Sequence, residues 1–142
     1  MADIFRIVEV EIETCWRDLS EDSAGAYVVF DGRVRNLNDG RQVRLLEYEA
    51  YEPVATQEGE KILAEARERF AIAGVQCWHR VGTLQIGDLA IRAQVIAGHR
   101  AEAFDACRYV VDEIKRRVPI WKKEHYVDGD SGWLDTSGRL LQ

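Results

Sequence analysis

Residues 89–119 read LAIRAQVIAGHRAEAFDACRYVVDEIKRRVP and contain the two clearest periodic patterns of the chain. From 89 to 97 every second residue is apolar, which predicts a β-strand. From 103 to 118 apolar side chains recur every three or four residues, which predicts an amphipathic helix. Pro119 ends that helix because a proline removes a backbone donor and clashes with the preceding turn. The predicted fold is therefore organised around a strand that leads directly into a helix.

Apolar runs before this unit predict further strands. They cover residues 4–12, 25–35, 43–51 and 75–81, with a short apolar piece between Gly82 and Gly87-Asp88. Thr14 is expected to cap a short helical turn through Leu19. Asp39-Gly40 is a strong hairpin signal, so residues 43–51 are predicted to be the return strand of the one before it.

A second helix and an extended tail complete the pattern. Pro53 suits the first turn of a helix that continues to about residue 70. The tail from Ile120 is predicted to be extended and rich in turns. The order β-β-β-α-β-β-α-β favours an α+β fold with antiparallel or mixed sheets and two main packing helices. The length, 142 residues, predicts a single domain over residues 1–142.

The composition excludes several classes of protein. The net charge is −6, which argues against a general nucleic-acid binder, whose footprint is a broad basic face. No apolar run approaches the roughly 20 residues that cross a bilayer, so no membrane role is expected. The first residues lack the basic-then-apolar order of a signal peptide. Three widely spaced cysteines predict reduced thiols in a cytoplasmic protein.

Residues 115–123, KRRVPIWKK, carry five basic side chains and no acidic one. Three of the four lysines of the chain lie here, namely Lys115, Lys122 and Lys123. A lysine can lose its proton when it is desolvated and then act as a base or nucleophile. The helix dipole alone favours cations at a helix end, which accounts for Arg116 and Arg117 but less well for lysines beyond Pro119. The segment therefore predicts an anion site with reactive amines.

Two other places combine polar groups suited to anions. His99 and Arg100 stand at the predicted start of the second long helix, where free N–H groups and the dipole attract negative charge. A capping turn that binds nothing explains the same residues. Arg33, Arg35, Asn36 and Asn38 suit phosphate or heterocycle recognition, although a solvated hairpin tip is the commoner structure.

The distance between these groups predicts how a site would be built. Fifteen helical residues separate Arg100 from Lys115, which is about 22 Å at 1.5 Å per residue. One small substrate could not touch both within one chain. A two-fold dimer would bring the helix start of one subunit to the helix end of the other.

The histidines and cysteines do not indicate a metal site. Cys77, His79, His99, Cys107 and His125 lack the spacing of metal ligands, so no metal is expected. His79 alternates with apolar residues of a strand and is interpreted as a hydrogen-bonded sheet histidine. The sequence also lacks the glycine-rich phosphate-binding motifs and the nucleophile elbow.

Six segments together resemble the large, catalytic subunit of molybdopterin synthase. They occur in the family's order and spacing between about residues 25 and 135, and they are FDGRVRN (30–36), LEYEAY (46–51), HRVGTL (79–84), GD (87–88), GHRAEAF (98–104) and KRRVPIWKKE (115–124). Val54 departs from the methionine expected in many relatives. The resemblance implies an α/β-hammerhead-like fold.

The resemblance also implies an activity. The family inserts two sulfurs into cyclic pyranopterin monophosphate and so forms the dithiolene of molybdopterin. Sulfur arrives as a thiocarboxylate on the C-terminal Gly-Gly of a small ubiquitin-like subunit, so no cofactor of this chain is expected. Two large subunits form a homodimer within a heterotetramer. By motif, Lys115 and Lys122 are catalytic, and Arg35, His99 and Arg100 bind the phosphate and pterin.

Two other functions remain open on the residues alone. A non-catalytic module that binds an anion or a C-terminal tail would explain the basic cluster without chemistry. A small hydrolase or lyase using His99 with a lysine would turn over without a protein partner.

Overall fold

The computed structural model describes residues 2–141 and confirms the α+β class with two main helices. Its elements, in chain order, are β1 (Ile4–Val8), the 3₁₀ helix η1 (Ile12–Thr14), β2 (Ala26–Arg33), β3 (Leu37–Asn38), β4 (Arg41–Ala50), α1 (Glu52–Arg69), β5 (Ile72–Arg80), β6 (Gly82–Gln85), β7 (Leu89–Ala97), α2 (Arg100–Arg117), β8 (Ile120–Tyr126) and β9 (Gly129–Asp135).

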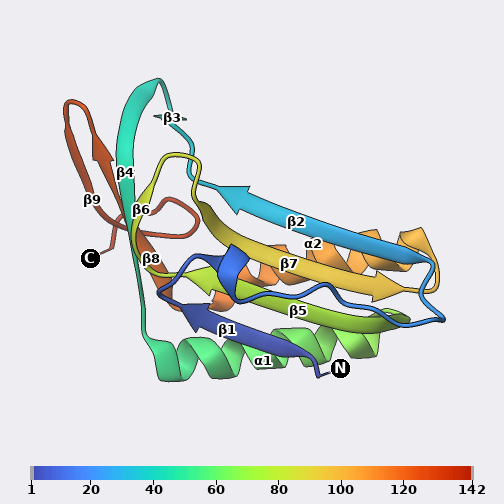
Figure 1. Cartoon of the computed structure of the whole chain (residues 1–142). Coiled ribbons are helices and arrows are strands. Elements are labelled where there is room, and N and C mark those ends of the chain that lie inside the picture. Colours follow the sequence, from blue (N-terminus) through green and yellow to red (C-terminus); the bar gives the residue numbers. More distant parts are fainter. Residues whose placement is uncertain (1, 142) are drawn as a thin grey trace.

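The first sheet has the order β1-β5-β7-β2 and is covered by both helices on one face (Figure 1). β1 runs parallel to β5, whereas β5, β7 and β2 are antiparallel neighbours. α1 packs on β1 and β5, and α2 packs on β7 and β2. Every residue of β7 is buried, because this central strand is covered on both faces. The predicted strand and helix of residues 89–118 thus form the centre of the molecule.

A helical glycine allows α1 to approach β1 closely. Gly59 is buried in the middle of α1, and a Cβ added there would lie 2.2 Å from the ring of Phe5. Glycine usually weakens a helix interior, so its place here follows from this close packing. The ring of Phe5 is only 2% exposed and belongs to the main core.

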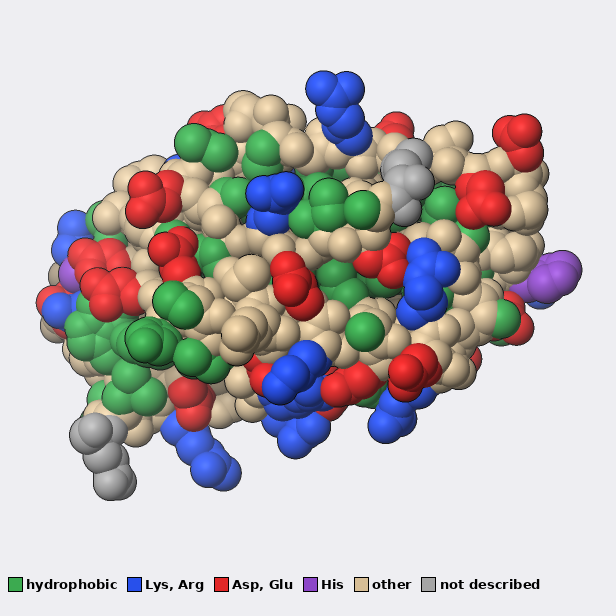
Figure 2. Space-filling view, turned by 90° about the horizontal axis from the view of Figure 1, so that it is seen from below, with side chains coloured by type: hydrophobic (Ala, Val, Ile, Leu, Met, Phe, Trp, Pro, Cys, Tyr) green, Lys and Arg blue, Asp and Glu red, His purple; other side chains and the backbone are tan. Residues whose placement is uncertain are grey.

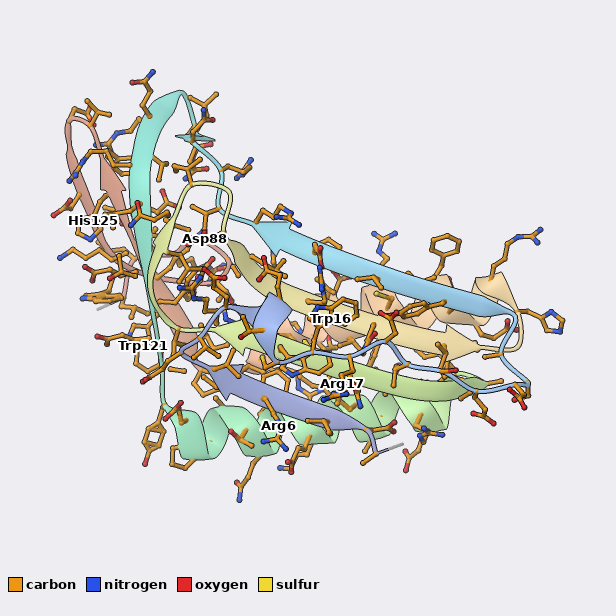
Figure 3. The ribbon with its side chains drawn as sticks, viewed as in Figure 1. Arg6, Trp16, Arg17, Asp88, Trp121 and His125 are labelled. Carbon is orange, nitrogen blue, oxygen red and sulfur yellow. The ribbon has the colours of Figure 1, made fainter. Side chains whose placement is uncertain are left out.

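The segment after β1 covers the other face of the first sheet, and here the sequence prediction was wrong in two details. β1 ends at Val8 rather than at residue 12. Thr14 does not cap a helix running to Leu19; it lies at the end of η1, where its hydroxyl donates to the Glu11 carbonyl at 2.7 Å. Trp16 follows and stacks on the Arg92 guanidinium 4.1 Å from the ring centre (Figure 3). This segment is held by sheet contacts, which its own sequence does not reveal.

The second sheet contains β3, β4, β8 and β9, with β6 also paired to β4, and rises at one end of the first sheet (Figure 1). The Asp39-Gly40 hairpin is confirmed: both residues have positive φ, 49° and 79°, and they join β3 to β4. However, residues 43–51 do not return along the previous strand, because β2 pairs with β7. β4 instead packs Val43 and Leu46 into a separate small core.

The tail after α2 forms a β-hairpin rather than a single extended strand. The helix ends at Arg117, and Ile120 begins β8, which pairs with β4 on one side and β9 on the other. Alternation along β8 gives Lys122, Glu124 and Tyr126 one face and Lys123 and His125 the opposite face. On that opposite face His125, labelled in Figure 3, lies 3.1 Å from Glu47 and 2.9 Å from Asp130, so it links β8 to both neighbouring strands.

Charged side chains of both signs are mixed on the surface seen in Figure 2, with hydrophobic side chains between them. This face has no broad basic area of the kind that binds nucleic acids. Among the described residues, no helix is both long and apolar enough to cross a membrane.

Candidate functional site

A pocket of about 160 Å³ lies where the two sheets meet, beside the C-terminal end of α2. Residues from six strands, from two loops and from α2 form its walls. Those used below are Arg33, Arg35, Asn38, Tyr48, His79, Lys115, Lys122, Glu124 and Thr136. The pocket therefore collects polar groups from segments spread over most of the chain.

Three of the five predicted site residues meet in this pocket. Lys115 comes from the last turn of α2, Lys122 from the inner face of β8, and Arg35 from the loop after β2. Lys115 and Arg35 are exposed, whereas the Lys122 side chain is 21% exposed. Within residues 2–141 neither Lys115 nor Arg35 forms an ion pair, so both cations are available to an anionic ligand.

A buried carboxylate holds Lys122. Glu124 is 3% exposed, accepts a hydrogen bond from Asn38 Nδ2 at 2.9 Å and another from the Tyr126 hydroxyl, and lies 3.3 Å from Lys122 Nζ. Burial opposes the charged form of Glu124, but the hydrogen bonds from Tyr126 and Asn38 and the charge of Lys122 outweigh it and lower its pKa. Glu124 is therefore ionised and fully partnered.

His79 is a sheet histidine, as predicted, and it also lines the pocket. It is 5% exposed, its Nδ1 lies 2.9 Å from the Arg80 carbonyl oxygen, and its ring meets Tyr48 edge-on at 5.0 Å. Burial lowers the pKa of His79 to about 4; the hydrogen bond to Arg80 opposes this shift and the charge of Lys115 adds to it. His79 is thus a neutral group among cations.

The tail after Trp133 also reaches the site. The Thr136 hydroxyl donates to the Lys115 carbonyl oxygen and Thr136 lines the pocket. Arg80 and Arg92 have partners elsewhere: Arg80 pairs with Asp88 at 3.4 Å and Arg92 with Asp31 at 2.6 Å. Neither lines the pocket, and neither does Arg139.

His99 and Arg100 lie at the opposite end of α2 and are exposed. His99 occupies the N-cap position with extended backbone, and its side chain does not cap the helix. One chain therefore does not bring these two residues to Lys115, as the helix length predicted.

Arg117 has a structural role that the sequence did not reveal. Its guanidinium binds Glu65 and Glu58 of α1 and Glu113 of α2 at 2.5, 2.7 and 3.2 Å. The helix dipole alone is therefore not a sufficient explanation of Arg117, whereas Arg116 is exposed and, within residues 2–141, pairs with Glu113 alone. This cluster fixes the end of α2, which carries Lys115, against α1.

Sequence reasoning missed the pocket roles of Tyr48, Glu124 and Thr136. The alternation of β8 was the available signal for Glu124, because a residue two positions after Lys122 shares its face. No comparable signal exists for Tyr48 and Thr136, which reach the pocket only through the packing of the second sheet. Among residues 2–141 no group of three or more His, Cys, Asp or Glu side chains is arranged to hold a metal ion.

The fold and the pocket define a class: two-sheet α+β proteins with a pocket lined by lysine and arginine side chains. A family model described as "MoaE protein" matches residues 7–117, which include Lys115 and end before Lys122. The chain belongs to this family, that of the molybdopterin synthase catalytic subunits.

Individual relatives agree with this assignment. The chain is 44% identical over 127 residues to the molybdopterin synthase catalytic subunit of Pyrococcus abyssi, covering 89% of this chain and 85% of the relative. The chain is also 48% identical over 118 residues to the molybdopterin synthase catalytic subunit of Nostoc, covering 82% of this chain and 72% of the relative. The crystal structure of molybdopterin synthase from Staphylococcus aureus superposes with a TM-score of 0.82 at 36% identity, covering 94% and 97% of the two chains.

Proposed function

We propose that this chain transfers sulfur from the thiocarboxylated C-terminus of a small ubiquitin-like subunit to cyclic pyranopterin monophosphate, forming the dithiolene of molybdopterin. The observation that carries the proposal is the convergence of Lys115, Lys122 and Arg35 in one pocket of a chain that belongs to the MoaE family. Two lysines and an arginine suit a phosphorylated substrate and the anionic tail of a thiocarboxylate.

The surroundings of the two lysines support different roles. Lys122 is paired with the buried carboxylate of Glu124, so it is held as an oriented cation that binds an anion. Lys115 forms no ion pair among the described residues and lies at the mouth of the pocket. We assign Lys115 to the thiocarboxylate carbonyl, as general acid and base or as transient acyl acceptor, because such a role needs an amine that can exchange its proton.

A second copy of the chain would complete the site with His99 and Arg100. The pocket of one chain is smaller than the roughly 300–1,000 Å³ of common small-molecule sites. β2 is an edge strand; its residues Val29 and Phe30 are 40% and 39% exposed, and the neighbouring Phe104 of α2 is 59% exposed. An open strand edge with exposed apolar side chains is suited to pairing with another copy, which supports a homodimer within a heterotetramer.

The sulfur donor is the partner subunit, so no cofactor of this chain is invoked. We place the protein in the cytoplasm because its cysteines, Cys15, Cys77 and Cys107, are all free thiols.

A reconstitution assay tests this function. Purified chain, thiocarboxylated small subunit and cyclic pyranopterin monophosphate are mixed, and molybdopterin is quantified as its fluorescent oxidation product. We expect product only when all three are present. Turnover of the pyranopterin without the small subunit would favour a hydrolase or lyase, and tight binding of the small subunit without any product would favour a tail-binding module.

A further inference from the structure

A backbone carbonyl group of its own strand determines which ring nitrogen of His79 carries the proton. Its Nδ1 lies 2.9 Å from the Arg80 carbonyl oxygen, which can only accept a hydrogen bond. Nδ1 therefore carries the proton, and Nε2 of the neutral ring has a free lone pair. The edge-on contact with Tyr48 at 5.0 Å, 74° between the ring planes, holds the imidazole in this orientation.

Nε2 is the ring nitrogen that remains available to bind a molecule in the pocket. His79 is 5% exposed and lines the cavity, and none of the hydrogen bonds among residues 2–141 involves its Nε2. Nε2 is not one of the fully buried polar atoms that lack a partner, so it is open to the cavity, where it can accept a hydrogen bond from a bound molecule in place of water.

The other polar groups of the pocket show which part of a ligand would meet His79. Arg35, Lys115 and Lys122 donate hydrogen bonds and attract anions. The remaining strong acceptor, Glu124, already has three partners in Asn38, Tyr126 and Lys122. His79 Nε2 is therefore a free imidazole acceptor of the pocket that can receive an uncharged N–H or O–H group of a bound molecule.

We propose that His79 is a substrate-binding residue whose Nε2 accepts a hydrogen bond from an N–H donor of the substrate's heterocycle, while the arginine and lysines bind its phosphate. This inference rests on the proposed function for the identity of the ligand. The heterocycle of the substrate would then lie against His79, and its phosphate would lie against Arg35, Lys115 and Lys122.

Two variants with opposite consequences test the role of His79. In His79→Asn the amide can replace Nδ1 as donor to Arg80, but nothing reaches the position of Nε2. In His79→Gln the longer amide places an acceptor near the position of Nε2. We expect His79→Asn to weaken binding of cyclic pyranopterin monophosphate, and to raise its KM, by about 10-fold, the effect of one hydrogen bond. His79→Gln should remain within about 3-fold of the wild type on the same basis.

Nitrogen NMR of the wild-type protein, labelled with ¹⁵N-histidine, provides a test that does not depend on the folding of a variant. We expect His79 to be the Nδ1–H tautomer, and the Nε2 resonance to move upfield when the pyranopterin is added. An Nε2–H tautomer, or an Nε2 resonance that does not move at saturation, would overturn the proposal.

The outcomes separate this inference from the proposed function. A wild-type protein that makes no molybdopterin would contradict the function itself. A wild-type protein that makes it, together with a His79→Asn variant that binds the pyranopterin as tightly, would contradict only the role of His79. The same holds if His79→Asn lowers kcat and leaves the binding constant unchanged.

Discussion

Lys115 and Lys122 line one pocket although they lie on different elements and Pro119 separates them. The end of α2 presents the first, and the inner face of β8 presents the second. Among the described residues only Lys122 has a carboxylate partner, Glu124 at 3.3 Å. The two ammonium groups therefore share a site but differ in their surroundings, which makes their substitutions informative.

Lys122→Arg keeps the charge but replaces a compact ammonium with a larger planar group. If the site carries out chemistry, this change should lower the rate of molybdopterin formation by about 10-fold or more, because misplacement by an ångström is costly in a reacting geometry. Binding of the small subunit, measured by calorimetry, should change little. Lys123→Arg is the matched control, since Lys123 points to the opposite face near the Trp133 ring. Normal activity of Lys122→Arg would favour a binding module.

A subunit-mixing experiment tests whether the site is shared. Arg100→Ala and Lys115→Ala should each be inactive as homodimers. After exchange of subunits, half of the dimers are mixed and each contains one intact site, so about a quarter of the wild-type activity should return. The rate of molybdopterin formation is the measurement.

Mixing Lys115→Ala with Lys122→Ala is the control for this experiment. Both residues line the same pocket of one chain, so no mixed dimer would contain an intact site. No activity should return. Equal recovery in the two mixtures, or none in either, would contradict a site assembled from two copies.

The periodic elements of the chain could be predicted from its sequence, and long-range pairing could not. The strand and helix of residues 89–118 are confirmed. The periodicity of the helix reports burial on one face, whereas the strand is buried on both faces, including its polar residues Arg92 and Gln94. The predicted partner strand of β4 was wrong. Across the Asp39-Gly40 turn β4 pairs with the two residues of β3, and not with the long strand before it. Within the site, Lys115 and Lys122 stand out as lysines in a basic segment, whereas His79 looks like any sheet residue until the second sheet is placed beside it.

Protonation of His79 should destabilise the fold in acid. Its pKa is about 4 in the folded chain against an ordinary 6.5, so below 6.5 the unfolded chain binds the proton more readily. The stability contributed by the neutral ring is complete above 6.5 and is lost as the pH falls through 4. Between pH 7.5 and 5 the loss is about 2 kcal/mol from this group. Urea denaturation of the wild type and of His79→Gln at pH 7.5 and at pH 5 measures this loss of stability. The variant should not show the part of the loss that comes from His79. Equal losses in the two proteins would contradict it.

Arg117→Ala should destabilise the protein by about 2 kcal/mol, because it leaves three neighbouring carboxylates without their common partner. Arg116→Ala is the control on the same helix and should leave the free energy of unfolding nearly unchanged, since Arg116 is exposed. Urea midpoints provide both values. Similar effects of the two substitutions would show that the cluster around Arg117 does not fix the end of α2.

The rate at which Lys115→Ala forms molybdopterin from the pyranopterin and the thiocarboxylated small subunit tests the proposed chemistry most directly. Lys123→Ala, which removes the same charge from the opposite face of β8, serves as the control and should be nearly as active as the wild type. Lys115→Ala should bind the small subunit and form essentially no product. Molybdopterin formation by Lys115→Ala at the wild-type rate would contradict the assignment of this pocket as the site of sulfur transfer.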